Sequence, residues 1–181
     1  MHTNTHKKFL NPTTVLFNAG LKAGQTVVDL GAGSGFFALA SAEIVGNNGH
    51  VDVVDVKDTA LEHIVAEAKM RNLKNIKTYI ANLDLAKLPS HIRLEHADVV
   101  ILANILHEIQ DMNNLLIHTY AMLKSGGRVV VIDWNDTPGH FGPVADKRVG
   151  EEKVKKVIGS KFQYIKNIET DQYHYGLVFE K

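Results

Sequence analysis

The sequence predicts an α/β fold of three layers, in which helices cover both faces of a mostly parallel sheet. Short apolar segments of strand length alternate with segments of helical periodicity between residues 25 and 133. The first apolar segment runs directly into a glycine-rich turn, Gly31-Ala-Gly-Ser-Gly35, as happens where a parallel sheet binds a ligand at its carboxyl edge. Two further strand-like segments, joined by a tight turn, close the chain.

The first helix is predicted from the residues at its two ends. Asn11 is a favourable helix cap, and Pro12 suits the first helical position because its missing N–H group would have no helical partner there. The helix runs to Ala19 and ends at Gly20. The largely apolar segment Gln25–Leu30 follows, which is typical of a strand buried on both faces of a parallel sheet.

The middle of the chain continues the alternation of strands and helices. Helical periodicity is clear over Asp58–Arg71, where Leu61, Ile64 and Ala68 fall on one face. Ala97–Ala103 is the most hydrophobic of the predicted strands. The other elements predicted here are a helix over 35–45, strands over 50–55 and 76–81, a helix over 112–123, a turn over 124–127 and a strand over 127–133.

The last part of the chain departs from this alternation. The segment 135–148 is a long connection that contains Pro138, Gly139, Gly142 and Pro143, and loops of this length in compact domains are often functional. A short helix over 151–158 precedes a hairpin of strands 162–170 and 173–180 around Asp171-Gln172. Five strand–helix units followed by a hairpin predict one antiparallel strand on the C-terminal side of the sheet. We expect one domain over 1–181, with residues 1–8 flexible.

The spacing of the glycines indicates which ligand the first turn binds. The dinucleotide pattern G-x-G-x-x-G would place its third glycine at Phe36, whereas this turn has G-x-G-x-G. Asp29 stands just before the turn, where a carboxylate repels a pyrophosphate and attracts a cation. S-adenosylmethionine carries an ammonium and a sulfonium group and no phosphate, so the turn favours this cofactor. The alternative is a tight strand–helix turn without a ligand.

The segment Asp29-Leu-Gly-Ala-Gly-Ser-Gly35 resembles motif I of the class I, Rossmann-like, S-adenosylmethionine-dependent methyltransferases. The similarity extends from about Phe9 to the C-terminus, and the region around Trp134 and the closing Tyr173–Phe179 resemble a small subgroup akin to the ubiquinone/menaquinone-biosynthesis methyltransferases. The resemblance implies a seven-stranded sheet with strand order 3-2-1-4-5-7-6 and strand 7 antiparallel.

The resemblance also implies a set of cofactor-binding positions. The glycine turn would hold the methionine part, the acid that ends the second strand would bind the ribose hydroxyls, and the next residue would pack on the adenine. The alternative for that acid is to cap the following helix. Asp84 would accept a hydrogen bond from the adenine amino group, with Asn82 as a rival. The full set of predicted cofactor-binding residues is Asp29, Gly31, Ala32, Gly33, Gly35, Phe36, Asp55, Val56, Leu83, Asp84 and Asn104.

Candidates for the chemistry follow the fourth and fifth strands. Asn104 is predicted at the junction of cofactor and acceptor. His107 lies one helical turn further on and is a candidate general base, because histidine transfers protons near neutral pH; the alternative is that it packs under the next loop. Trp134 is the only tryptophan and is a candidate to stack on the acceptor, with packing at the rim as the alternative. His107 and Trp134 are therefore the predicted substrate contacts.

Composition excludes several classes of function. There is no cysteine, which excludes disulfides, thiolate metal sites and cysteine nucleophiles. No two histidines form H-x-H or H-x-x-x-H on a plausible element, so we expect no metal. The net charge is zero, which disfavours nucleic acid as a partner. No apolar run approaches the roughly 20 residues of a membrane span, and we expect a cytoplasmic protein with no membrane partner.

The sequence therefore predicts direct in-line transfer of the sulfonium methyl group to a small-molecule acceptor. Few residues precede the first strand, so either the acceptor site is shallow, or a second subunit of a homodimer or a large substrate completes it. Protein or RNA methylation is an alternative, and the short basic cluster between Lys147 and Lys156 would have to face the methyl group in that case. A non-catalytic, S-adenosylmethionine-binding partner subunit is the other alternative.

Overall fold

The computed structural model describes residues 10–90 and 92–181, so the prediction for residues 1–8 lies outside the described residues. The helices are α1 (Pro12–Ala19), α2 (Phe36–Val45), α3 (Asp58–Met70), α4 (Met112–Met122) and α5 (Glu151–Ile158), with a 3-10 turn, η1 (Ala145–Lys147). The strands are β1 (Thr26–Leu30), β2 (His50–Asp55), β3 (Ile76–Ile80), β4 (Ala97–Ala103), β5 (Leu123–Trp134), β6 (Gln163–Ile168) and β7 (His174–Glu180).

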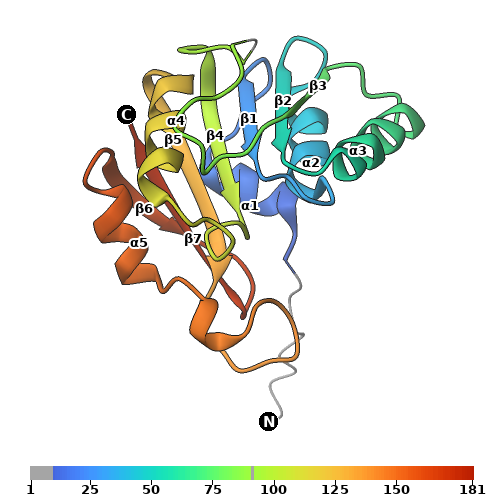
Figure 1. Ribbon diagram of the computed structural model, residues 1–181. Coiled ribbons are helices and arrows are strands. Elements are labelled where there is room, and N and C mark those ends of the chain that lie inside the picture. Colours follow the sequence, from blue (N-terminus) through green and yellow to red (C-terminus); the bar gives the residue numbers. More distant parts are fainter. Residues whose placement is uncertain (1–9, 91) are drawn as a thin grey trace.

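The seven strands form one sheet with the order β3-β2-β1-β4-β5-β7-β6, which confirms the predicted topology. β1 to β5 run parallel to one another, and β7 is antiparallel to both β5 and β6. Figure 1 shows α1, α2 and α3 on one face and α4 and α5 on the other, so the molecule has the expected three layers.

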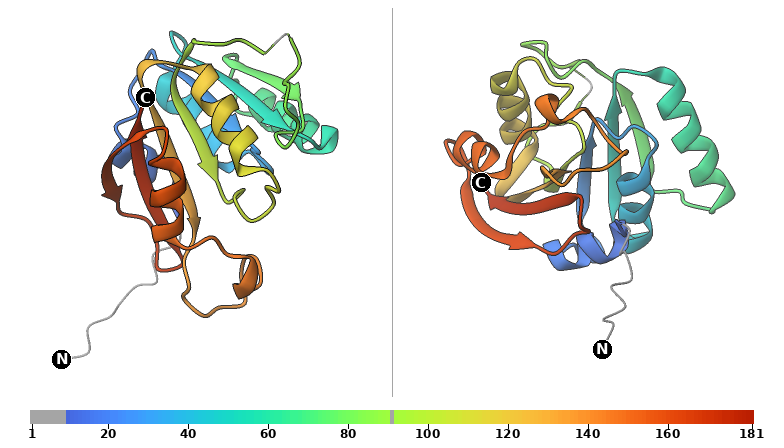
Figure 2. Two further views of the ribbon diagram at one scale, coloured as in Figure 1. Left: turned by 60° about the vertical axis from the view of Figure 1, so that its left-hand side comes forward. Right: turned by 90° about the horizontal axis from the view of Figure 1, so that it is seen from below.

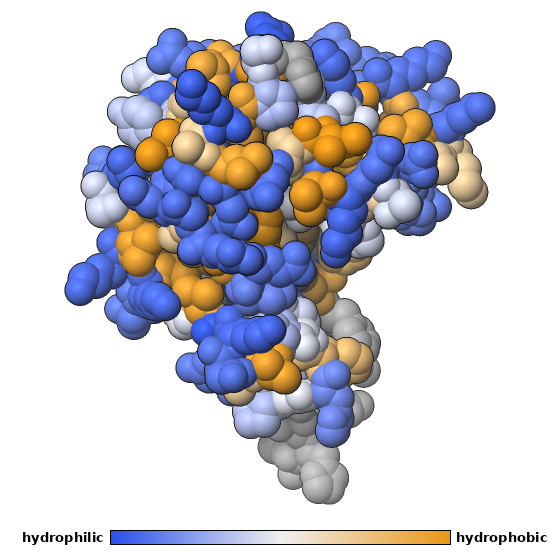
Figure 3. Space-filling model, in the orientation of Figure 1, coloured by the Kyte–Doolittle hydropathy of each residue, from blue (hydrophilic) through white to orange (hydrophobic). Residues whose placement is uncertain are grey.

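Each face of the sheet has its own hydrophobic core, because successive strand residues point to opposite faces. In β1, Val28 and Leu30 pack toward α4 and α5, whereas Val27 packs toward α1 and α2. β4 and the second half of β5, Val129–Ile132, read as nearly continuous apolar runs because both of their faces are covered. Hydrophilic side chains cover most of the face seen in Figure 3, with apolar side chains exposed in separate small groups.

The end signals of α1 act as the sequence predicts. The side chain of Asn11 accepts a hydrogen bond from the amide of Thr14 at 3.0 Å. Gly20 ends the helix in the left-handed region, with φ of 90°, a conformation that costs glycine nothing.

Two local predictions are wrong. The connection from β3 to β4 contains no helix among its described residues, so the third strand–helix unit lacks its helix. The predicted turn over 124–127 is part of β5, whose pairing with β4 begins at Leu123 and shifts register before Arg128. Gly126 adopts a φ of 72° there, and the backbone of Lys181 exchanges hydrogen bonds with Gly126 and Gly127. The glycines thus make an irregular start to a strand, because the C-terminal residue supplies the missing partners.

The long connection from β5 to α5 lies beyond the carboxyl ends of the parallel strands, at the bottom of Figure 1. The view from below in Figure 2 shows this segment crossing in front of the sheet. No helix in the described ranges is both long enough and apolar enough to cross a membrane.

Candidate functional site

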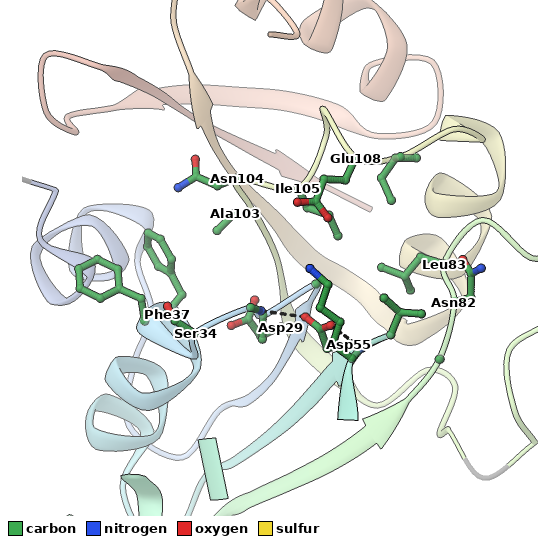
Figure 4. A pocket seen from close by; sticks show the side chains of 18 of the residues that line it. Asp29, Ser34, Phe37, Asp55, Asn82, Leu83, Ala103, Asn104, Ile105 and Glu108 are labelled. Carbon is green, nitrogen blue, oxygen red and sulfur yellow. Dashed lines mark hydrogen bonds between the residues drawn. The ribbon is translucent and has the colours of Figure 1, made fainter. Parts of the chain in front are cut away.

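A cavity of about 270 Å³ opens at the carboxyl ends of β1, β2 and β4. The order of the strands reverses between β1 and β4, which is where open α/β sheets bind ligands. Its wall is built from four chain segments: the glycine turn, the end of β2, the segment after β3 and the segment after β4. The lining residues are Asp29, Gly31, Ala32, Gly33, Ser34, Phe36, Phe37, Asp55, Val56, Lys57, Ala81, Asn82, Leu83, Asp84, Ala103, Asn104, Ile105, Glu108 and Ile109. Figure 4 shows the side chains of most of them converging on the cavity.

The glycine turn needs glycine for two different reasons. At Gly31, φ is 72° and an added Cβ would lie 1.9 Å from Cδ1 of Ile105, so no other residue fits. At Gly33, φ is 53° and an added Cβ would meet nothing within 4 Å, so the protein leaves open space there. The amide of Gly33 donates to Oδ2 of Asp55 at 2.9 Å, which ties the turn to the end of β2. The turn is a cradle that leaves room for a ligand beside the backbone.

Gly35 does not line this cavity, although it was predicted among the cofactor-binding residues. It is the cap residue of α2 with φ of 80°, and an added Cβ would lie 2.5 Å from Cγ1 of Ile64. The structure therefore gives Gly35 a packing role between α2 and α3, whereas the neighbouring Phe36 does line the cavity and is half exposed.

Asp29 is the most unusual group in the cavity wall. Its side chain is 1% exposed, and within the described part of the chain neither carboxylate oxygen has a hydrogen-bond partner. Burial, and secondarily the charge of Asp55, raises the pKa of Asp29 to about 7, although the nearby amide of Ala38 lowers it slightly. An unpaired carboxyl buried at a cavity wall fits a ligand that brings a cation or a hydrogen-bond donor.

Asp55 ends β2 and is held in place by backbone amides. Its Oδ2 accepts from Gly33 and its Oδ1 accepts from Lys57, both at 2.9 Å, as the dashed lines in Figure 4 show. Each carboxylate oxygen keeps a further lone pair that can accept from a ligand hydroxyl. Val56 is exposed beside it and presents an apolar surface to the same cavity.

The segment after β3 supplies the opposite wall. Leu83 is buried and lines the cavity. Oδ1 of Asp84 accepts from the amides of Gln110 and Asp111 at 2.9 Å each, so this oxygen is already engaged in holding the start of α4. Asn82 lines the cavity too, and its side-chain oxygen accepts from the amide of Asp84 at 2.9 Å. Both of the rival residues predicted for the adenine amino group are therefore present at this wall.

Asn104 lies at the junction where β4 ends. Its φ is 55°, which is uncommon for a residue other than glycine, and its amide donates to the carbonyl of Ile132 at 2.8 Å. Its side-chain oxygen is buried and has no partner among the described residues. Such a strained, unsatisfied residue at a cavity wall is a reason to suspect a ligand contact.

His107, the predicted base, is not in the cavity wall; its neighbours Glu108 and Ile109 are. The His107 side chain is 17% exposed and its Nδ1 is buried without a partner within the described ranges. It lies close enough to the buried Asp133 to help lower the pKa of that carboxyl, which burial nevertheless raises. Asp133 itself accepts from the amides of Trp134 and Leu106, so this group holds the ends of β4 and β5 together.

Trp134 also lies outside the cavity wall and is partly buried by other parts of the chain. The ring centroids of Trp134 and His174 are 4.2 Å apart, and an added Cβ on Gly142 would lie 2.5 Å from the indole. The guanidinium of Arg148 lies 5.8 Å from the ring centroid. Packing against the connection 135–148 thus occupies the side chain that was predicted to stack on an acceptor.

Several lining residues were not predicted from the sequence. Lys57 directly follows Val56, and Ser34 and Phe37 flank predicted positions, so chain proximity was a usable signal for them. Ile105 and Glu108 follow a predicted position as well, but which of residues 105–109 face the cavity depends on the turn geometry after β4. In the described ranges, no three His, Asp or Glu side chains are placed to hold a metal ion.

Comparison with known proteins gives a consistent set of similarities. A family model described as a methyltransferase domain matches residues 21–177. Among curated proteins, the ubiquinone/menaquinone biosynthesis C-methyltransferase UbiE of Psychromonas ingrahamii is 31% identical over 120 residues, which are 65% of this chain and 45% of that protein. The chain thus spans less than half the length of this curated relative.

Solved structures share the fold over almost the entire chain. A SAM dependent methyltransferase from Aquifex aeolicus superposes with a TM-score of 0.86 and 22% identity, covering 95% of this chain and 90% of that one. The [4+2]-cyclase SpnF superposes with a TM-score of 0.77 and 15% identity, covering 94% and 79%. Because a cyclase shares the fold, the fold alone does not determine the reaction, and the side chains of the cavity must be considered.

Proposed function

The chain belongs to the methyltransferase domain family, and on that premise we propose that it is an enzyme that uses S-adenosylmethionine to methylate a small-molecule acceptor. The observation that carries the proposal is the buried, unpartnered carboxyl of Asp29 beside the open space at Gly33. A cationic amino-acid moiety satisfies that carboxyl, whereas a pyrophosphate would be repelled by it.

The other lining residues supply the remaining contacts that such a cofactor needs. Asp55, fixed by the amides of Gly33 and Lys57, is the acceptor for two ribose hydroxyls. Val56 and Leu83 provide apolar walls for the adenine ring, and Asn82 or Asp84 faces its amino group. Asn104 stands where the acceptor meets the methyl group.

S-adenosylmethionine, when bound, supplies a methyl group that its sulfonium centre already activates. The protein then has to hold the acceptor in line with that group, and alignment of this kind can contribute roughly 7–11 kcal/mol. No covalent enzyme intermediate is required for such a transfer, because the sulfonium centre already activates the methyl group. His107 would have to act from outside the wall, so we assign it to the packing of the segment after β4.

Two observations support a small molecule as the acceptor. The UbiE relative carries the name of a C-methyltransferase of ubiquinone/menaquinone biosynthesis. The basic residues between 147 and 156 do not line the cavity: Arg148 donates to loop carbonyls and Lys155 pairs with Glu151 and Glu152. These contacts leave little basic surface near the cavity for the phosphates of an RNA.

Isothermal titration with S-adenosylmethionine tests the cofactor. We expect binding by the wild-type protein and its loss in Asp55→Ala, because this substitution removes the acceptors of Gly33, Lys57 and the ribose. Asp146→Asn, an exposed residue outside the cavity, serves as the control. Folded wild-type protein that binds no S-adenosylmethionine at millimolar concentration, or that binds NAD instead, would contradict the proposal.

The acceptor can be sought with S-adenosylmethionine labelled in the methyl group. Incubation with cell extract, followed by separation of small molecules from protein and RNA, should place the label in the small-molecule fraction. Label in protein or RNA would make the acceptor macromolecular, and label that stays on S-adenosylmethionine at every extract concentration would favour a non-catalytic binding subunit.

A further inference from the structure

The cavity is strongly negative. Four carboxylates, those of Asp29, Asp55, Asp84 and Glu108, line it against one ammonium, that of Lys57. Figure 4 shows Asp29, Asp55 and Glu108 reaching the cavity from three different segments of the chain. Asp29 is 1% exposed and has no hydrogen bond of good geometry in the described part of the protein, so its negative charge, once formed, is stabilised by little more than the nearby amide of Ala38.

Glu108 differs from the other three carboxylates because cofactor binding gives it no obvious partner. Asp55 is held by two amides, and one oxygen of Asp84 is held by two more. Glu108 has a fixed backbone, since its amide donates to the carbonyl of Ile105 at 2.9 Å, but a side chain that is 63% exposed. Among the described residues, only His107 comes within ion-pair distance of it, at 3.8 Å. Glu108 is therefore a largely exposed carboxylate in the cavity wall whose neighbouring cation, among the described residues, is His107 when that ring is protonated.

The two ligands that a methyltransferase must exchange differ in charge. S-adenosylmethionine carries a carboxylate, an ammonium and a sulfonium, for a net charge of plus one. When a nucleophile takes the methyl group, the carbon–sulfur electron pair stays on sulfur, the positive charge leaves with the methylated acceptor and is released as a proton, and S-adenosylhomocysteine remains with no net charge. A negative cavity holds the first ligand more strongly than the second.

Resting on the proposed function, we propose that this cavity discriminates the charged cofactor from its neutral product by electrostatic attraction, and that Glu108 is the residue that determines this preference. The product keeps its contacts with Asp29 and Asp55 but loses the attraction that the sulfonium charge gave the cofactor. Because Glu108 is exposed and its charge is partly screened by water, we expect it to contribute about three- to tenfold to the ratio of the two dissociation constants at low salt.

The test compares both ligands with the same set of proteins. Dissociation constants for S-adenosylmethionine and S-adenosylhomocysteine are measured by titration calorimetry at pH 8, at about 0.02 M and about 0.5 M salt. Glu108→Gln removes the charge, Glu108→Asp keeps it, and Glu152→Gln removes a charge from α5, outside the cavity, where the side chain is 87% exposed. Thermal unfolding of each variant checks that it is folded.

We expect the wild type to bind S-adenosylmethionine more tightly than S-adenosylhomocysteine at low salt. Glu108→Gln should raise the dissociation constant of S-adenosylmethionine about three- to tenfold and change that of S-adenosylhomocysteine by less than twofold. Glu108→Asp and Glu152→Gln should keep the preference, and the higher salt concentration should shrink it. If Glu108→Gln raised both dissociation constants equally, or changed neither, this inference would be overturned and the proposed function would stand. Failure of the wild type to bind either ligand would overturn the proposed function and this inference with it.

Discussion

At the scale of single residues, Asp29 is the group whose environment departs most from that of an ordinary surface acid. It is buried at the end of β1 without a hydrogen-bond partner among the described residues, and its pKa is raised to about 7. Burying an unpaired carboxyl costs free energy that a packed apolar residue would not cost. The same position lines the cavity, so the cost is recovered when a cationic ligand binds.

The affinity for S-adenosylmethionine should therefore depend on pH. Below about pH 7 the Asp29 carboxyl of the free protein is protonated, and the ligand must displace that proton to form its ion pair. We expect the dissociation constant to be flat above pH 7 and to rise by up to about tenfold per pH unit below it. Calorimetry from pH 5.5 to 8.5 in two buffers of different ionisation enthalpy measures both the affinity and the proton released. A flat profile across this range would contradict the assignment of Asp29.

Ionisation of Asp29 should lower the stability of the free protein as the pH rises, whereas it raises the affinity for the cofactor. An acid whose pKa is higher in the folded state contributes stability at low pH and loses it as the pH rises from 3.8 through about 7. At pH 8 its ionisation costs roughly 4 kcal/mol. Asp29→Asn should thus be at least as stable as the wild type at pH 8 in denaturant titrations, while its affinity for S-adenosylmethionine falls. A less stable Asp29→Asn protein would show that the carboxylate has a partner in the fold.

At the scale of elements, the glycine turn offers a matched pair of substitutions. Gly33 and Gly24 have φ of 53° and 81°, and an added Cβ would meet nothing within 4 Å at either position. Substitution of either glycine by alanine should lower the free energy of unfolding by about 1–2 kcal/mol, because alanine disfavours the left-handed backbone conformation. Only Gly33 lines the cavity, so only Gly33→Ala should weaken S-adenosylmethionine binding, by about tenfold or more. Equal affinities of the two variants would show that the ligand does not approach Gly33.

The connection 135–148 is organised by a single guanidinium group. Arg148 donates to the carbonyls of Asn135, Thr137, Pro143 and Phe141, at 2.7 to 3.3 Å. Phe141 is exposed at the far side of this connection. The loop therefore has a polar core of its own instead of an apolar one.

Arg148→Ala should loosen this loop and make chymotrypsin cleavage after Phe141 several-fold faster. We expect a loss of about 1 kcal/mol in the free energy of unfolding, because partly buried carbonyl groups lose their donors. Arg148→Lys should recover only part of the protection, since an ammonium cannot reach four carbonyls as a planar fork does. The control Lys147→Ala changes an exposed neighbour and should be cleaved at the wild-type rate. If Arg148→Ala were also cleaved at that rate, Arg148 would not be what holds the connection 135–148 together.

At the scale of the whole molecule, one buried carboxylate joins distant parts of the sheet at the edge opposite the cavity. Asp52 on β2 accepts from His50 at 2.8 Å and from His96, which precedes β4, at 2.7 Å. Burial opposes ionisation of Asp52, but the hydrogen bonds and charges of His96 and His50 outweigh it and lower the pKa of this carboxyl. A group with a lowered pKa stabilises the fold above its unfolded value of 3.8 and loses that contribution as the pH falls through the folded value.

Asp52→Asn should consequently destabilise the protein at pH 5 to 7 by about 1–3 kcal/mol, and the difference from the wild type should disappear below about pH 3. Urea unfolding at a series of pH values measures this difference. Asp146→Asn, which changes an exposed carboxylate, should show no such dependence. A difference that persists below pH 3 would assign the effect to packing and not to charge.

The succession of strands and helices was predictable from local signals repeated along the chain, whereas the order of the strands in the sheet was implied by the family resemblance. The end signals of α1, the apolar strands and the hairpin around Asp171 each act over a few residues, and a right-handed crossover between parallel strands leaves few arrangements. The start of β5 was not predictable in this way, because the glycines at 126 and 127 are paired by Lys181 from the other end of the chain.

The candidate site was only partly predictable for a similar reason. Asp29, Gly31, Gly33 and Asp55 stand at strand ends, so their common location follows from the order of the elements. Gly35 packs on Ile64, and Trp134 contacts His174; both contacts join residues that are far apart in the sequence. Whether His107 or its neighbours line the cavity depends on the turn that Glu108 and Ile105 close after β4, which no local pattern specifies.

The amino-acid sequence by itself determined the alternation of strands and helices, the glycine turn and the acids at the ends of β1 and β2, because each depends on residues close together in the chain. The order of the strands in the sheet was implied by the family resemblance of the glycine turn. Only the tertiary structure decided which side chains share the cavity, that Asp29 is buried there without a partner, and that Glu108 and not His107 faces it. Burial, pairing and the resulting charge of a group depend on which distant segments pack around it, and no local pattern contains that information.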